Sequence, residues 1–262
     1  MNNKILLLLL IVGIGLSYGQ ENIKLCGIRI SFPPDNNEAT SGNGQFLLSK
    51  DSVDMDLLQP LPVDPPPHDK SYFEDHIRAL ANYYKKASSG MVQIDTVNSK
   101  IYPQSKNGSY QLAKEMAYYH PFLKEDSVEI RLNELIRDAV RIADDDINYR
   151  SYDIVVVFHA GLGQIYNIDL DPTPKDIKSA YMGLPDFKKY LGLSNGIEVN
   201  DGNHYVTDAI VLPETQNYIQ YDNWEEVFGE LDNPEEYQFG LNGTFALMMG
   251  FYLGLPSLTD TS

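Results

Sequence analysis

Apolar residues recur at helical spacing in two long segments of the chain. In residues 71–88 and 127–144 they lie three and four positions apart, which predicts two amphipathic helices. Each segment also shows the spacing of a capping box at a helix start. The box residues are Ser71 with Glu74, and Asp126 with Glu129. The apolar positions are Phe73, Ile77, Leu80, Ala81 and Tyr84 in the first segment, and Val128, Leu132, Leu135, Ile136, Ala139, Val140 and Ala143 in the second.

Strands are predicted between and beside these helices. The clearest one carries five consecutive apolar residues from Ile154 to Phe158, which is typical of a strand buried on both faces beneath helices. Five prolines within residues 60–67 exclude a helix or a central strand there and indicate an extended crossing segment. The sequence therefore predicts a mixed α/β fold. The predicted strands are 23–32, 90–97, 152–164 and 205–214; a short helix is predicted at 110–119, and loops at 165–204 and 215–240.

The last apolar segment, LNGTFALMMGFYLGLPSLTD, covers residues 241–260. It predicts a helix near residues 243–253. Gly250 and Gly254 form a G-x-x-x-G pair, which also occurs in membrane-spanning helices. Gly243 and Pro256 interrupt the segment, and its wholly apolar run is shorter than a bilayer requires. A buried helix is therefore favoured over a membrane span.

The N-terminus has the three parts of a secretory signal peptide. Lys4 is the positive residue, residues 5–16 are apolar, and Ser17 and Gly19 supply small residues before a cleavage site. We expect cleavage after Gly19, with one domain over residues 20–262 and a secreted or extracytoplasmic location. An uncleaved membrane anchor is the alternative interpretation.

Composition narrows the range of partners. The 262 residues carry a formal net charge of −17, which argues against binding to nucleic acid or to an anionic membrane. Cys26 is the only cysteine, so no intrachain disulfide is possible, and its place in a predicted strand favours a buried thiol over a nucleophile.

Several stretches together resemble the immune-inhibitor-A-like family of secreted zinc metallopeptidases. This resemblance implies a zincin- or metzincin-like domain, with a twisted mixed sheet, packed helices and an active-site helix near residues 243–253. The stretches are SGNGQF (41–46), PPHDKSYFEDHIRALANYYKKASSGMVQIDTV (66–97), YDIVVVFHAGLGQ (152–164), IVLPET (210–215) and GTFALMMGFYLGLPSLTD (243–260).

In that family the terminal segment resembles Gly-x-x-Ala-His-Glu-x-Gly-His-x-Leu-Gly-Leu-Pro-Asp-Leu-x-Asp. The two histidines bind zinc and the glutamate activates the bound water. The corresponding residues here are Leu247, Met248 and Phe251, and Ser257 lies at the acidic position; none of them suits zinc or a base. We therefore expect these side chains to have joined the core. The scaffold positions are kept at Gly243, Ala246, Gly250, Leu253, Gly254, Leu255, Pro256, Leu258 and Asp260.

The resulting hypothesis is an exported pseudoenzyme that binds an extracellular protein, peptide or polysaccharide. In the resembled family a further subdomain follows the active-site helix. We therefore expect a fragment that lacks the C-terminal subdomain and has an exposed apolar edge. One alternative is an active secreted zinc endopeptidase with relocated ligands, and another is a structural or adhesive surface module.

Other candidate metal ligands lack a diagnostic spacing, and no cofactor is predicted. No two of the five histidines are spaced as a helical zinc pair. His159 follows the buried strand, where a hydrogen-bonded structural role is favoured over a role in a cleft. Calcium is possible at two acidic groups that lack EF-hand spacing, so a solvated acidic surface is favoured. These groups are Asp144, Asp145 and Asp146, and Asp169 with Asp171; the histidines are His68, His76, His120, His159 and His204.

Overall fold

The computed structural model describes residues 21–52, 63–121, 125–164, 173–221 and 238–256. The chain forms a seven-stranded sheet with main strand order β4-β2-β6-β11-β8, in which β5 extends the pairing of β2 and β7 that of β6. All these strands are parallel except β8, which pairs antiparallel to β11 at the edge. The bounds are β2 Leu25–Ser31, β4 Lys100–Tyr102, β5 Tyr110–Gln111, β6 Ile154–Gln164, β7 Ile177–Lys178, β8 Ala180–Gly183 and β11 Asp208–Thr215.

The central strand is β6, as its apolar run predicts. Ten of its 11 residues are buried, and it pairs in parallel with β2 on one side and β11 on the other. A strand in this position contacts helices through both faces, which explains why it lacks the alternation of a half-exposed strand.

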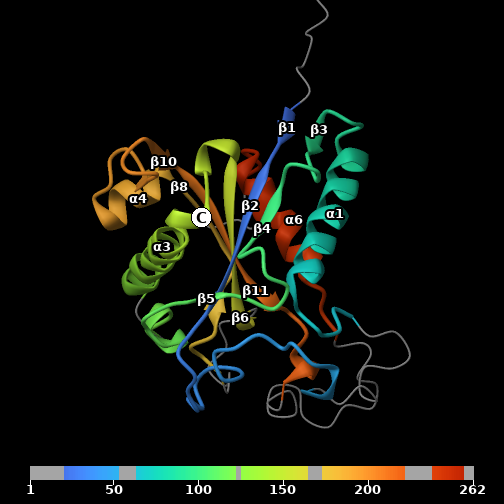
Figure 1. The fold of residues 1–262 in the computed structure, drawn as a ribbon, viewed down its shortest axis with the longest axis vertical. Coiled ribbons are helices and arrows are strands. Elements are labelled where there is room, and N and C mark those ends of the chain that lie inside the picture. Colours follow the sequence, from blue (N-terminus) through green and yellow to red (C-terminus); the bar gives the residue numbers. More distant parts are fainter. Residues whose placement is uncertain (1–20, 53–62, 122–124, 165–172, 222–237, 257–262) are drawn as a thin grey trace, which may run out of the picture.

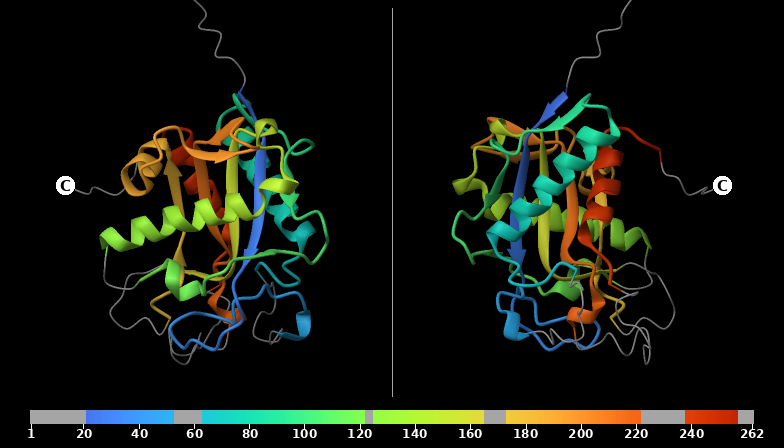
Figure 2. Two further views of the ribbon diagram at one scale, coloured as in Figure 1. Left: turned by 60° about the vertical axis from the view of Figure 1, so that its left-hand side comes forward. Right: turned by 90° about the vertical axis from the view of Figure 1, so that its right-hand side faces the viewer.

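Helices cover both faces of the sheet and give three layers (Figure 1). Two separate apolar cores result, one under α3 and α4 and the other under α1 and α6. Figure 2 shows α3 in front of the sheet in its left view, and α1 beside α6 in its right view. The bounds are α1 Lys70–Ala87, α2 Met116–Tyr119, α3 Glu125–Ile142, α4 Leu184–Leu191 and α6 Leu241–Tyr252.

The first long helix starts in a different way from the predicted capping box. Asp69 is the N-cap of α1, because its carboxylate accepts hydrogen bonds from the backbone N–H groups of Ser71 and Tyr72. Glu74 instead pairs with Lys70. The prediction of Ser71 as the cap was wrong, since an aspartate two residues earlier takes that role.

Two segments differ from the sequence prediction. Residues 110–119 begin with strand β5 and form only a one-turn helix, α2. Residues 173–204, predicted as loop, contain β7, β8, α4 and β9. Helix α4 has Pro185 in its first turn and Gly192, with φ +71°, at its end. That pairing of proline and glycine was a usable helix signal.

Short elements complete the described chain. Strands β1 and β3 form one small parallel sheet, and β9 and β10 form a small antiparallel one. Within the described ranges, no helix has the length and apolar character needed to cross a membrane. The bounds are β1 Glu21–Ile23, β3 Val92–Ile94, β9 Ile197–Val199 and β10 His204–Val206, with 3₁₀ turns at Lys50–Ser52, Asp144–Asp146, Tyr149–Ser151 and Tyr218–Gln220.

Candidate functional site

Helix α6 packs against the sheet, and its bounds lie close to the helix predicted near residues 243–253. Leu241, Phe245 and Met249 recur every four residues, are fully buried and face the core shared with α1. Tyr84 of α1 joins the two helices, because its hydroxyl donates a 2.6 Å hydrogen bond to the carbonyl of Ala246. The inner face of α6 is therefore fixed by packing and by hydrogen bonds to α1, of which the Tyr84–Ala246 bond is one.

The end of α6 gives the glycine and proline residues of the resembled segment a structural role. Gly254 has φ +82°, and the N–H of Leu255 donates a 2.9 Å bond to the carbonyl of Gly250, as in a Schellman motif. A Cβ on Gly250 would lie 3.3 Å from both the Leu255 side chain and the Tyr84 hydroxyl. Pro256 follows, where a helix cannot continue. The G-x-x-x-G-L-P pattern thus forms a helix stop, whatever chemistry the helix carries.

The residues at the resembled ligand positions do not all lie in the core. Met248 is buried and Phe251 is half-buried, but the Leu247 side chain is 48 % exposed. The expectation that these positions have joined the core was therefore wrong for Leu247, because this part of α6 faces solvent. Ser257, together with the scaffold positions Leu258 and Asp260, lies outside the described residues.

An apolar groove of about 490 Å³ runs between α1 and α6. Leu80, Tyr83 and Tyr84 line it from α1. Leu247 and Phe251 line it from α6, so two of the resembled ligand positions face this hollow. The exposed side chains of Tyr83, Leu247 and Leu255 give this side of the molecule an apolar surface.

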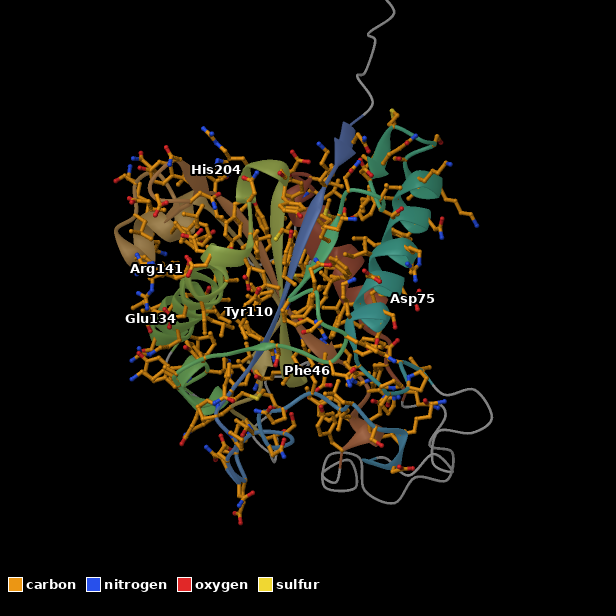
Figure 3. All side chains as sticks on the ribbon, viewed as in Figure 1. Phe46, Asp75, Tyr110, Glu134, Arg141 and His204 are labelled. Atoms are coloured by element: carbon orange, nitrogen blue, oxygen red, sulfur yellow. The ribbon has the colours of Figure 1, made fainter. Side chains whose placement is uncertain are left out.

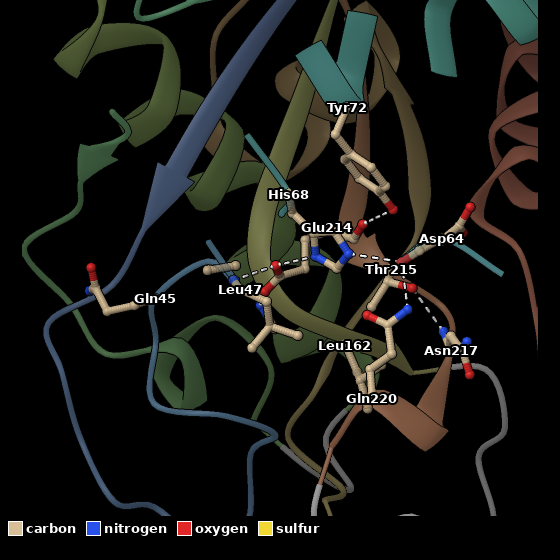
Figure 4. A network of polar contacts seen from close by, with 12 residues as sticks. Gln45, Leu47, Asp64, His68, Tyr72, Leu162, Glu214, Thr215, Asn217 and Gln220 are labelled. Atoms are coloured by element: carbon tan, nitrogen blue, oxygen red, sulfur yellow. Dashed lines mark hydrogen bonds and ion pairs between the residues drawn. The ribbon is translucent and has the colours of Figure 1, made fainter. Parts of the chain in front are cut away.

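A second cluster lies at the carboxyl ends of β6 and β11, around the fully buried carboxylate of Glu214 (Figure 4). One carboxylate oxygen accepts hydrogen bonds from the Gly161 N–H and the Tyr221 hydroxyl, each at 2.7 Å. The other accepts from the Leu47 N–H at 2.9 Å and lies 2.6 Å from Nδ1 of His68. Four donors surround the carboxylate, and none of its oxygens is open to a ligand.

His68 is as buried as Glu214, and both of its ring nitrogens face oxygen acceptors. Nδ1 meets the Glu214 carboxylate, and Nε2 lies 2.9 Å from the carbonyl of Asp64. The ring also stacks on Tyr72, whose hydroxyl donates to the Glu214 carbonyl at 2.8 Å. His68 therefore joins the crossing segment to strand β11.

Asp64 connects this cluster to the start of α6. Its backbone has φ +50°, and its carboxylate accepts a 2.6 Å hydrogen bond from the Leu241 N–H at the first turn of α6. His76 lies beside it, with Nδ1 2.9 Å from the Asn242 amide oxygen. Burial lowers the pKa of His76, against the opposing effect of Asp64. Asp64 thus caps α6 from a distant part of the sequence.

His159 is fully buried near the end of β6, and its Nδ1 donates a 2.9 Å hydrogen bond to the Ala160 carbonyl. Burial lowers its pKa to about 4. Figure 3 shows His204 near the upper edge of the molecule, well away from Phe46 in the loop after β2. His120 Nδ1 faces the Pro174 carbonyl at 3.3 Å. In the described ranges, no three His, Cys, Asp or Glu side chains are grouped closely enough to hold a metal ion.

The acidic group at residues 144–146 makes structural contacts. Asp144 accepts a 2.9 Å hydrogen bond from the Asn200 N–H, and Asp146 accepts one of 2.7 Å from the Tyr110 hydroxyl. Asp169 and Asp171 lie outside the described residues. Cys26 is buried in β2, and burial raises the pKa of its thiol.

Sequence reasoning did not find the Glu214 cluster. Glu214 directly follows the apolar run of β11, and a carboxylate at the end of a buried strand is a usable signal. Its partners come from residues 47, 68, 161 and 221, and no local pattern connects these positions.

Three comparisons with known proteins found no relative of this chain. No family model matches the chain, no curated protein matches it, and no solved structure matches its fold. The resemblance of residues 41–260 to a metallopeptidase family therefore stays a prediction.

Proposed function

We propose that this chain is an exported, non-catalytic binding protein on a metallopeptidase-like scaffold, and that it binds through the surface shared by α1 and α6. The proposal includes the signal peptide over residues 1–19 and a secreted or extracytoplasmic location. It also includes the descent implied by the terminal segment, in which a zinc-binding helix has become an apolar one.

One observation carries this proposal. Leu247 and Phe251, one helical turn apart at the two resembled histidine positions, both line the groove beside α1. A catalytic zinc needs about three nitrogen, oxygen or sulfur ligands together with an open water position. On the α6 side of this groove, the two corresponding side chains are hydrocarbons, which do not bind zinc. Such a surface gains free energy by binding apolar groups.

An active peptidase with relocated ligands has less support. It requires at least two histidines that converge on one point. His68 contacts Glu214 and Asp64, His76 contacts Asn242, and His159 contacts its own strand. Each of these side chains has a structural partner of its own.

A proteolysis assay on the purified full chain tests the proposal. With an unfolded protein as substrate and excess zinc present, we expect no cleavage above a blank, and no change when a chelator is added. Zinc-dependent cleavage that the chelator abolishes would overturn the proposal. Export is tested separately by N-terminal sequencing of protein recovered from the medium, with Gln20 expected as the first residue.

A double variant tests whether the backbone of α6 can place two zinc ligands on its groove side. Leu247→His with Phe251→His places two imidazoles one turn apart on the groove side of α6, a spacing that binds zinc. We expect the double variant to gain zinc affinity that the wild-type chain lacks. An equal affinity in both proteins would mean that zinc binds elsewhere.

A further inference from the structure

We propose that the groove between α1 and α6 is a binding site for a neutral, largely apolar small molecule. This inference rests on the proposed function, because it assigns a ligand class to the same surface.

The groove has the dimensions of a small-molecule site. Its volume of about 490 Å³ falls within the range of roughly 300–1,000 Å³ that is usual for ligand pockets. Twelve residues line it, whereas a stable protein interface uses about 20–30 residues on each side. A small molecule therefore fits this hollow better than a second copy of the chain.

Small residues on one face of α6 create the hollow. Gly243, Ala246 and Gly250 are spaced by three and four positions, so they share a face of the helix and all line the groove. A Cβ on Gly243 would meet nothing within 4 Å. Ala79 of α1 also lines the groove, so small side chains occur on both helices.

The walls are held in place by contacts within the protein. Tyr84 is fixed by its hydrogen bond to the Ala246 carbonyl, and Leu255 by the backbone bond that ends α6. These contacts therefore fix part of the wall before a ligand binds, and the exposed side chains of Tyr83, Leu247 and Leu255 complete it.

The groove lining disfavours charged ligands. None of the lining residues is Asp, Glu, Lys, Arg or His, although the chain has a net charge of −17. An ionic ligand would lose hydration here and gain no ion pair. The polar groups available are the Asn242 side chain and the tyrosine hydroxyls, which suit a ligand with few polar atoms.

The test is a fluorescence titration of the full chain with N-phenyl-1-naphthylamine, a neutral aromatic probe. We expect saturable binding of about one probe per chain in the micromolar range. Leu247→Glu should weaken binding by about tenfold or more, because it places a charge on the apolar wall. Ile142→Glu is the control; Ile142 is similarly exposed but lies on α3, across the sheet.

A second variant fills the groove without destabilising the fold, so that a loss of binding can be assigned to the groove itself. Gly243→Leu replaces a helical glycine that faces open space, so the variant should fold while its side chain occupies the hollow. We expect a raised melting temperature and loss of probe binding. Probe binding at wild-type strength in this variant would overturn the inference.

Other outcomes separate the two proposals. Absence of saturable probe binding, or equal weakening by the Leu247 and Ile142 variants, overturns the inference. A dimer that Leu247→Glu dissociates also overturns it, in favour of a second copy of the chain. If the chain also shows no zinc-dependent proteolysis, the proposed binding role survives with another ligand. Zinc-dependent proteolysis would contradict the proposed function, whether or not the probe binds.

Discussion

The Glu214 cluster and the α1–α6 groove use opposite chemistry in opposite surroundings. The cluster combines a buried carboxylate, an imidazole and two tyrosines, residue types that often perform catalysis, yet its carboxylate is closed in by four donors. The groove is open to solvent, yet leucine, phenylalanine and tyrosine line it. An enzyme usually places polar groups in its open cleft. Here polar groups hold the fold together, and apolar groups face the space where a ligand can bind.

The largest expected effect comes from removing the centre of the cluster. Glu214→Ala would leave three hydrogen-bond donors and the His68 imidazole without the carboxylate that they contact, so we expect the free energy of unfolding to fall by about 3–5 kcal/mol. Denaturant titration measures this change. The exposed Glu198 is the control, and Glu198→Ala should shift stability by no more than about 0.5 kcal/mol. A loss below about 1 kcal/mol for Glu214→Ala would show that the cluster does not hold these loops.

The buried histidine of β6 should make stability depend on pH. His159 has its pKa lowered to about 4, while an unfolded chain takes up that proton near pH 6.5. The unfolded state therefore binds more protons between these values. Stability is fully present above about pH 6.5 and falls by about 3 kcal/mol as the pH drops to about 4. Unfolding free energies of wild type and His159→Gln across this window measure the effect, and an unchanged slope in the variant would contradict it.

Two glycines of α6 should respond in opposite directions. Gly243→Ala adds a methyl group in open space, so the free energy of unfolding should rise by about 0.5–1 kcal/mol. Gly250→Ala would press on the Tyr84 hydroxyl and on Leu255, so it should lower stability. Thermal melts of the two variants make a matched pair. A gain in stability in both variants would mean that the space between Gly250, Tyr84 and Leu255 accommodates a methyl group.

The smallest expected change in stability belongs to Leu247→Glu. Leu247 is 48 % exposed, so the free energy of unfolding should change by no more than about 0.5 kcal/mol. The same variant should weaken probe binding by about tenfold or more. A loss of stability similar to that of Glu214→Ala would place Leu247 in the core and remove the contrast between the two regions.

Local sequence patterns predicted the central strand and the two long helices correctly. The apolar run Ile154–Phe158 identified the central strand, and helical periodicity identified α1 and α3. The edge strand β8 was missed because four residues carry too little periodicity to identify a strand.

The candidate site was only partly predictable. The sequence placed α6 well, but it could not show that Leu247 faces solvent, because that depends on the position of α1. Asp64 caps α6 across 177 positions of sequence, and no local spacing reveals such a contact. The apolar groove likewise forms only when two helices far apart in the sequence lie side by side.

The zinc content of the purified protein is the sharpest test of whether α6 carries an apolar binding surface or a metal site. Elemental analysis would be made on the purified full chain after dialysis against a weak chelator, beside the Leu247→His/Phe251→His variant treated in the same way. We expect far less than one equivalent of zinc in the wild-type chain and a measurable increase in the variant. One tightly held equivalent in the wild-type chain would contradict the claim that the α6 surface has exchanged metal chemistry for apolar binding.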